Sequence, residues 1–315
     1  MQSLEVIENL RNLRQEYLFN LTQNFRKSLI VFEIRQREKF DAKHLKESLH
    51  IPVQPPFSSN FTLKDICSLY PQESSLTKIR RYCIIIGSDV EGALVARNLE
   101  NLLKAQKCRE VHLFDNEYEE FLIRYPFLAE GFSVPHYPCI PCGFPNEIIP
   151  KFLYLGNHEH AENYDVLRTL GITHVLNSTK NVKNAFKEHG IRYCRVFVED
   201  SEEEKIHYHF QKAFKFIDEA KEIMLSGGSA AVLVHCAQGI SRSATIVTMF
   251  LMKEYDIPFE QCVEYLKSQR YIVEPNQGFI KQLKLFEARQ GLFTRSNTIK
   301  ESHRRTPPKR RIMDY

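Results

Sequence analysis

The chain has 315 residues, a length that predicts two domains, and 43% of its residues are hydrophobic, enough to form buried cores. The formal net charge of +4 is too small for the basic stripe expected of a nucleic-acid-binding protein. No apolar run reaches the roughly 18 residues of a membrane span, and the 8 cysteines show no disulfide framework. We therefore expect a cytoplasmic protein, in a reducing compartment, that binds neither membranes nor nucleic acids.

The first part of the chain predicts alternating helices and strands. Apolar residues recur at helical spacing from Leu4 to Tyr17. Buried strands are then predicted over residues 29–35, 82–87 and 111–114, with a helix over residues 91–105. This alternation indicates a parallel sheet.

The order of residues around the first strand resembles the opening of a rhodanese-like domain. The strand ends in Glu33 and Arg35, and Phe40, His44 and Pro52 follow as the aromatic, histidine and proline of that pattern. The resemblance continues through the later strands to a closing segment over residues 118–127. It implies a rhodanese-like domain over residues 1–130.

The loop after the second predicted strand lacks the nucleophile of a sulfurtransferase. An active rhodanese needs a cysteine there, whereas residues 87–92 read Gly-Ser-Asp-Val-Glu-Gly. Cys83 falls inside the predicted strand, so we expect it in the core. The domain therefore resembles the inactive rhodanese-like module that precedes the catalytic domain in MAP kinase phosphatases.

In those phosphatases the module docks kinases through basic residues that lie beside apolar ones. Lys78, Arg80 and Arg81, which precede the apolar residues 84–86, are the candidates here. The alternative is an ordinary solvated strand end.

Five prolines between residues 135 and 150 exclude a helix and disfavour a strand, so we predict a domain linker over residues 131–147. Within it His136, Cys139 and Cys142 have a spacing that zinc ligands use. No second cysteine pair follows at the usual distance, so we do not expect a metal site.

The sequence after the linker again predicts alternating strands and helices. Strands are expected over residues 149–156, 172–177, 191–198 and 230–234. Helices are expected over residues 161–170, 206–224 and 243–252, and in two further segments that follow Pro258 and Pro275. We expect these elements to form a second α/β domain over residues 148–290.

The central feature of this domain is the loop between the strand that ends near Val234 and the helix that begins near Ser243. A loop that leads into a helix directs backbone N–H groups, and the partial positive charge of the helix N-terminus, at one point. Gly239 permits a tight turn, and the planar guanidinium of Arg242 can hold two phosphate oxygens. Cys236 would ionise readily in such a place and become a nucleophile.

The local sequence, His-Cys-Ala-Gln-Gly-Ile-Ser-Arg-Ser, resembles the phosphate-binding loop of the dual-specificity branch of protein tyrosine phosphatases. The resemblance implies that Cys236 is the nucleophile, that Arg242 binds the transferred phosphate, and that Ser243 assists breakdown of the phosphocysteine. The alternative is a buried structural cysteine near a helix start. The residues implied in phosphate binding are His235, Cys236, Ala237, Gln238, Gly239, Ile240, Ser241 and Arg242.

Cleavage of a phosphate ester also needs an acid that protonates the leaving oxygen. The resemblance places this acid at Asp200, just after the strand predicted to end at Val198. Glu199 is the second candidate, and a helix-capping aspartate is the alternative role for Asp200. Because thiolate and arginine chemistry requires no metal, we expect no cofactor, and we expect the paired histidines His158 with His160 and His207 with His209 at the surface.

Residues 291–315 are polar and basic around Pro307 and Pro308, as is typical of a disordered tail. A nuclear import signal and a simple solvated terminus are the two interpretations of this tail.

The whole layout resembles the MAP kinase phosphatases. The short linker and the final residues resemble a pseudophosphatase within that group, whose loop lacks the His and the Cys, but both residues are present here. The resemblance implies a phosphatase that removes phosphate from phosphotyrosine, phosphoserine and phosphothreonine of a phosphoprotein, with a MAP kinase as one candidate. The alternative is a binding protein that captures phosphoproteins with little or no turnover.

Overall fold

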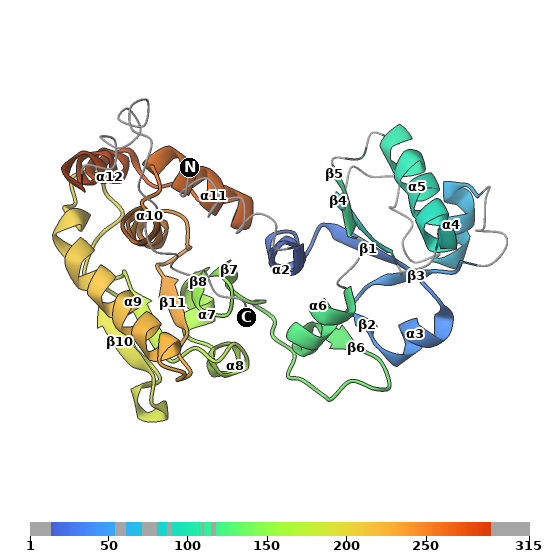
Figure 1. Ribbon diagram of the computed structural model, residues 1–315, viewed down its shortest axis with the longest axis horizontal. Helices are drawn as coiled ribbons and strands as arrows, with labels where there is room; N and C mark the ends of the chain where they lie inside the picture. The colour runs from blue at the N-terminus through green and yellow to red at the C-terminus, as the bar shows by residue number, and fades with distance from the viewer. Residues whose placement is uncertain are drawn as a thin grey trace, which may run out of the picture.

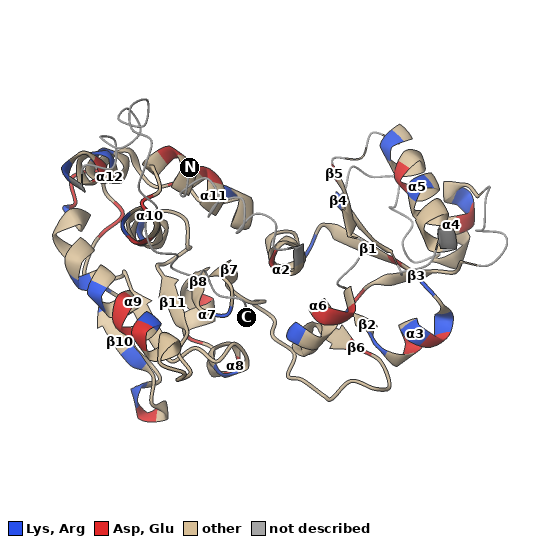
Figure 2. Ribbon diagram, viewed as in Figure 1, with Lys and Arg blue, Asp and Glu red and all other residues tan. Residues whose placement is uncertain are grey.

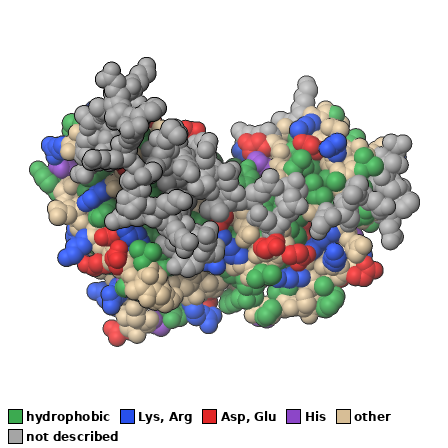
Figure 3. Space-filling model, viewed as in Figure 1, with side chains coloured by type: hydrophobic (Ala, Val, Ile, Leu, Met, Phe, Trp, Pro, Cys, Tyr) green, Lys and Arg blue, Asp and Glu red, His purple; other side chains and the backbone are tan. Residues whose placement is uncertain are grey.

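The computed structural model describes residues 14–53, 61–70, 81–86, 90–106, 108, 110–114 and 118–290. These residues form two units, each a sheet covered by helices, with helix α2 (Arg14–Asn24) between them (Figure 1). Acidic and basic side chains are interspersed along the helices and over the face seen in the space-filling view (Figures 2 and 3). No helix within the described ranges combines the length and the apolar character needed to cross a membrane.

The N-terminal unit contains the parallel sheet that the sequence predicts. Its strands lie in the order β3 (Leu49–Ile51), β1 (Leu29–Ile34), β4 (Arg81–Ile86) and β5 (Glu110–Phe114). Residues that alternate along β1 and β4 pack into separate apolar clusters on the two faces, which explains the continuous apolar runs in these strands. The helices of this unit are α3 (Arg37–Ala42), α4 (Leu63–Leu69), α5 (Val90–Ala105) and α6 (Tyr118–Arg124), and a small ladder joins β2 (His44–Leu45) to β6 (Ala129–Glu130).

The C-terminal unit contains a five-stranded sheet in the order β10-β9-β11-β8-β7. The strands are β7 (Asn146–Ile149), β8 (Leu153–Gly156), β9 (His174–Asn177), β10 (Arg192–Arg195) and β11 (Val232–His235). All neighbours are parallel except β7 and β8, which form a hairpin. The longer helices are α9 (Phe210–Leu225), α10 (Arg242–Tyr255), α11 (Phe259–Gln269) and α12 (Gln277–Gln290).

Three elements of this unit differ from the sequence prediction. The helix expected over residues 161–170 is two short helices, α7 (His158–Ala161) and α8 (Tyr164–Thr169), because Asn157 and Asn163 each accept a backbone N–H and start a helix. The strand expected over 149–156 is the β7–β8 hairpin. Strand β10 ends at Arg195 rather than at Val198, because its partner β9 already ends at Asn177.

Several predicted features lie outside the described residues: most of the expected N-terminal helix, Lys78 and Arg80, residues 87–89 of the loop that lacks a cysteine, and the basic tail. Cys83 lies in β4 as predicted, and burial raises the pKa of its thiol to about 12. Residues 131–145, between the two sheets, form neither strand nor helix, although Ile140 and Phe144 are buried.

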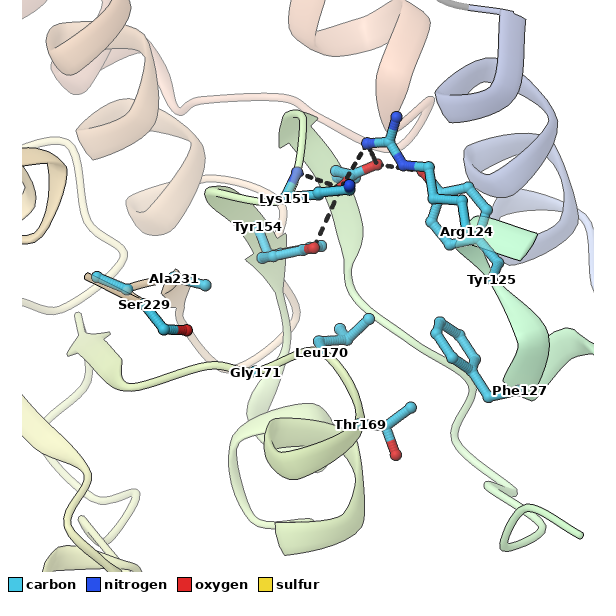
Figure 4. A pocket seen from close by; sticks show the side chains of 12 residues that line it. Arg124, Tyr125, Phe127, Lys151, Tyr154, Thr169, Leu170, Gly171, Ser229 and Ala231 are labelled. Atoms are coloured by element: carbon cyan, nitrogen blue, oxygen red, sulfur yellow. Dashed lines mark hydrogen bonds and ion pairs between the residues drawn. The ribbon is translucent and has the colours of Figure 1, made fainter. Parts of the chain in front are cut away.

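A buried cluster of charged residues joins the two units. Arg124, in α6, pairs with Glu16 in α2 and, at 3.2 Å, with Glu147 in β7. The Glu147 carboxylate also accepts hydrogen bonds from the hydroxyls of Tyr125 and Tyr154. Figure 4 shows Arg124, Tyr125 and Tyr154 beside a cavity of about 320 Å³ between the units.

We predict that Arg124→Leu lowers the free energy of unfolding by about 3–5 kcal/mol, because it leaves two buried carboxylates without their cation. Chemical denaturation monitored by fluorescence or circular dichroism measures the change. Arg168→Leu is the matched control, because Arg168 pairs with Asp165 at 3.0 Å on the surface and such pairs contribute about 1 kcal/mol or less. Equal effects of the two substitutions would contradict a buried ionic cluster.

Candidate active site

The predicted loop lies at the carboxyl end of the central strand of the second sheet. Strand β11 ends at His235, the loop covers residues 236–241, and α10 begins at Arg242. His235 is paired on one side with Gly156 of β8 and on the other with Asn177 of β9, so the loop emerges where three parallel strands end together. In open α/β sheets this edge is where ligands bind.

The backbone of the loop is turned so that its carbonyl groups face outward. Six of the seven carbonyls from His235 to Ser241 accept a hydrogen bond from a residue that lies outside residues 235–241. The exception is the carbonyl oxygen of Cys236, which lies 3.3 Å from Nδ1 of His235. The outward partners are Ser178 for His235, His158 for Ala237, Arg270 for Gln238 and Gly239, Glu274 for Ile240, and Thr245 for Ser241. The N–H groups are consequently free to converge on the inside of the loop, which is the arrangement that binds an anion.

Gly239 is required at its position by both conformation and space. Its φ of +72° is in the left-handed region that favours glycine. A Cβ atom there would lie 2.5 Å from the backbone oxygen of Gly156 and 2.9 Å from Nη2 of Arg270. The glycine therefore lets the loop pack directly against β8.

The thiol of Cys236 lies at the centre of this loop and is 1% exposed. Burial alone would raise its pKa, but hydrogen bonds from the Ser243 hydroxyl and from the backbone N–H groups of Ser243 and Ile240, together with the charge of Arg242, lower the pKa below its usual value. The Ser243 hydroxyl lies 3.2 Å and the Gly239 N–H 3.1 Å from Sγ. These contacts therefore favour the thiolate form of Cys236 relative to the thiol.

Two histidines near the loop are neutral at physiological pH. Burial lowers the pKa of His235 to about 4 and that of His160 to about 3. His160 was expected at the surface, and that expectation is wrong: its ring is buried because Nδ1 accepts the Asn157 N–H at the start of α7. His158, by contrast, is exposed and bonds to the carbonyl of Ala237.

Arg242 lies beside the thiol at the first position of α10. Its Nη1 donates to the carbonyl of Val198 at 3.3 Å, and its side chain is 11% exposed. Its Nε is buried and has no hydrogen-bond partner among the described residues, although the Asp200 carboxylate lies 3.6 Å away. A planar guanidinium beside the thiol suits the binding of an oxyanion.

Of the two candidate acids, the structure brings only Asp200 to the loop. Its Oδ1 accepts hydrogen bonds from the Ser241 hydroxyl at 2.6 Å and from the Asn276 side chain at 2.9 Å. Glu199 instead pairs with Lys180 at 3.2 Å, and its side chain is more than half exposed.

The remaining predicted residues lie elsewhere. Arg81 pairs with Glu110 at 2.9 Å and lies over the Phe25 ring, so its guanidinium already has partners. In the linker, Cys139 is exposed and Cys142 is half-buried. No group of three or more His, Cys, Asp or Glu in the described part of the chain is arranged to hold a metal ion.

Comparison with known proteins identifies the C-terminal unit. Residues 153–289 match the family described as the catalytic domain of dual specificity phosphatases. In fold, the C-terminal unit is like the dual-specificity phosphatase domains of the protein tyrosine phosphatase type. The matched segment begins at β8 and ends in α12, so it contains the loop, Asp200 and the strands that position them.

Relatives extend the similarity into the N-terminal unit. A probable rhodanese domain-containing dual specificity protein phosphatase of Dictyostelium discoideum is 27% identical, over 86% of this chain and 67% of its own length. Human dual specificity protein phosphatase 1 is 41% identical, over 59% of this chain and 55% of its own length. The similarity to the Dictyostelium protein, whose name includes a rhodanese domain, extends into the parallel-sheet N-terminal unit, and this chain spans about half to two thirds of these relatives.

A solved structure, the human tyrosine phosphatase-like serine/threonine/tyrosine-interacting protein, is 31% identical over 47% of this chain and 97% of that chain, with a TM-score of 0.42.

Four residues support the loop, and no pattern in the sequence indicates that role. Ser178, His158, Arg270 and Glu274 hold the loop carbonyls, yet each is a single residue near the end of a strand or helix. Only their contacts with the loop, which lies far away in sequence, give them a role.

We predict that Ser243→Ala raises the pKa of Cys236 by about one unit, since the lost hydrogen bond stabilises the thiolate by about 1.5 kcal/mol. The rate of alkylation by iodoacetamide against pH, read by mass spectrometry on the peptide that contains Cys236, gives this pKa. Thr248→Ala is the control, because the Thr248 hydroxyl donates to the carbonyl of Ala244 within α10 and not to the sulfur. An unchanged midpoint for Ser243→Ala would show that the hydroxyl does not stabilise the thiolate.

Proposed function

We propose that this protein is an active phosphatase that hydrolyses phosphate esters of protein side chains through a phosphocysteine intermediate. The observation that carries the proposal is the combination of a buried, hydrogen-bonded Cys236, a loop whose carbonyls face outward, and Arg242, whose charge lowers the pKa of the Cys236 thiol. A structural cysteine in a hydrophobic core would have a raised pKa, as Cys83 and Cys262 do, whereas the pKa of Cys236 is lowered.

In the first step the loop N–H groups and Arg242 bind the three non-bridging oxygens of the phosphate. The Cys236 sulfur attacks phosphorus, the bond to the leaving oxygen breaks, and Asp200 donates a proton to that oxygen. Charge that develops on the phosphoryl oxygens is stabilised by donors already in place, which is the largest contribution such sites make.

In the second step water attacks the phosphocysteine and Asp200 accepts its proton. The P–S bond breaks, inorganic phosphate forms, and the thiolate returns. The Ser243 hydroxyl, 3.2 Å from Sγ, stabilises the departing thiolate. Asp200 thus acts as acid in the first step and as base in the second. Asn276 and Ser241 hold its carboxylate beside the loop for both steps.

The substrate we propose is a phosphoprotein that carries phosphotyrosine, phosphoserine or phosphothreonine. The resemblance of the layout to MAP kinase phosphatases makes a MAP kinase the first candidate. Of the three residues proposed for kinase docking, Arg81 contacts Glu110 and Phe25, so a docked kinase would have to share or displace these contacts.

Cys236→Ser should lower turnover of a small aryl phosphate by more than about 10³-fold, because the hydroxyl is not ionised at neutral pH, while a phosphopeptide still binds in the loop. Steady-state kinetics and fluorescence anisotropy measure the two effects. Cys262→Ser, at a cysteine buried in α11, serves as the control for replacing a buried thiol. Undiminished hydrolysis by Cys236→Ser would refute the covalent mechanism, and a parent protein that binds but never hydrolyses would support the capture function instead.

Asp200→Asn should lower the rate by about 10²- to 10⁴-fold for an alkyl phosphate, whose leaving oxygen needs a proton. The loss should be much smaller for an activated aryl phosphate, whose leaving group departs as an anion. Comparison of kcat for the two substrates tests this difference, with Glu199→Gln as the matched control. Equal losses on both substrates would assign Asp200 a structural role.

A further inference from the structure

Arg270 connects the phosphate-binding loop to a network of amide side chains at the boundary between the two units. It follows α11, is 8% exposed, and each of its three guanidinium nitrogens has a different acceptor. Nε and Nη2 donate to the carbonyls of Gly239 and Gln238 at 2.9 and 3.0 Å, and Nη1 donates to Oδ1 of Asn146 at 2.7 Å. The same planar group therefore fixes two carbonyls of the loop and one side chain of β7.

Asn146 is itself held in place by helix α2. Its side-chain amide nitrogen donates to Oδ1 of Asn24 at 3.1 Å, to Oδ1 of Asn20 at 3.3 Å and to the carbonyl of Gln269 at 2.9 Å. Asn146 is fully buried, so these contacts determine how its other end, Oδ1, is presented to Arg270.

Asn20 uses all of its hydrogen-bonding capacity at this boundary. Its amide group pairs with both main-chain groups of Glu147 at 2.8 Å, as a neighbouring strand would, on the edge strand of the five-stranded sheet. It also donates to Oε1 of Gln269 at 2.7 Å and accepts from Asn146. With two donors and two acceptor positions occupied, the side chain has one orientation only.

A second contact reaches the same segment from the N-terminal sheet. The Phe25 ring, directly after α2, lies against the Tyr271 ring with centroids 4.9 Å apart, and the Arg81 guanidinium of β4 lies 3.9 Å from the Phe25 centroid. Gln269 and Tyr271 therefore contact α2 and Phe25. Arg270, which lies between them in the sequence, binds the loop. Figure 1 shows α2 in this position, between α11 and β1.

We propose that Arg270 is a positioning residue of the phosphate-binding loop and that helix α2, through Asn24, Asn20 and Asn146, sets its position. The loop can present its N–H groups inward only while its carbonyls are drawn outward, and Arg270 draws two of them. A segment outside the phosphatase domain thus completes the support of that domain's anion site. The inference rests on the proposed function only in taking phosphate as the ligand of the loop.

The test uses the full chain and two mild substitutions. Arg270→Lys keeps the charge but loses the planar guanidinium that reaches two carbonyls. Asn24→Ala removes a half-buried side chain that hydrogen-bonds to Asn146 and to the Gln269 carbonyl. Affinity for inorganic phosphate, measured by calorimetry, reports on the loop whether or not the protein turns over. We expect Asn24→Ala to weaken phosphate binding by about threefold to tenfold, as the loss of one hydrogen bond would, and Arg270→Lys to weaken it further.

The double variant separates positioning from general destabilisation. If Asn24 acts through Arg270, Arg270→Lys with Asn24→Ala binds phosphate no more weakly than Arg270→Lys alone. Tyr17→Phe is the control, because it removes a hydrogen bond of α2 to His112 on the side of the N-terminal sheet and should leave phosphate affinity unchanged.

Additive losses, or an Asn24→Ala protein that melts earlier but binds phosphate as the parent does, would overturn the inference while leaving the proposed function intact. A parent that binds phosphate without hydrolysing a phosphate ester would overturn the proposed function and leave this one standing. A parent that does not bind phosphate would overturn both.

Discussion

The outward direction of the loop carbonyls is the constraint on which the site depends. A backbone carbonyl turned toward the bound phosphate would place a negative dipole against a dianion, so every carbonyl that is turned away needs a donor elsewhere. The donors are supplied by several elements: the residue after β9, the start of α7, the segment after α11 and the first turns of α10. The nucleophile, its pKa and the arginine beside it are useful only within the backbone shape that these donors impose.

The same constraint explains the close packing around Gly239 and Gly156. The loop must approach the end of β8 closely enough for Arg270 to reach two successive carbonyls, and the space at Gly239 is too small for a Cβ atom. The left-handed φ of Gly239 turns its carbonyl toward Arg270 while its N–H points to the thiol. One glycine therefore serves the anion site, the thiolate and the contact with the sheet.

The sequence predicted the parts of the site that are contiguous, and missed those that depend on distant contacts. Strand β11, the loop and α10 form one continuous pattern of apolar and loop residues, so both their structure and the positions of Cys236 and Arg242 could be predicted. Asn20, Asn146 and Arg270 could not, because isolated polar residues are usually exposed and no periodicity marks those that are buried. Strand β7 was missed for a related reason: it lies among prolines, and its edge is covered by the side chain of Asn20 rather than by another strand.

The boundary between the units contains buried polar groups beside an apolar cluster that spans both units, and the polar groups bear on how the units move. Linked domains usually move relative to each other unless a large apolar interface fixes them. The amide groups of Asn20 and Asn146 and the Glu16–Arg124–Glu147 cluster lose their hydrogen bonds after a small displacement, and each lost partner leaves a buried polar group unpaired. The boundary therefore has one favoured geometry. Because β7 carries both Asn146, which binds Arg270, and Glu147, which pairs with Arg124, a displacement of α2 or α6 would act on the edge strand from which Asn146 contacts Arg270.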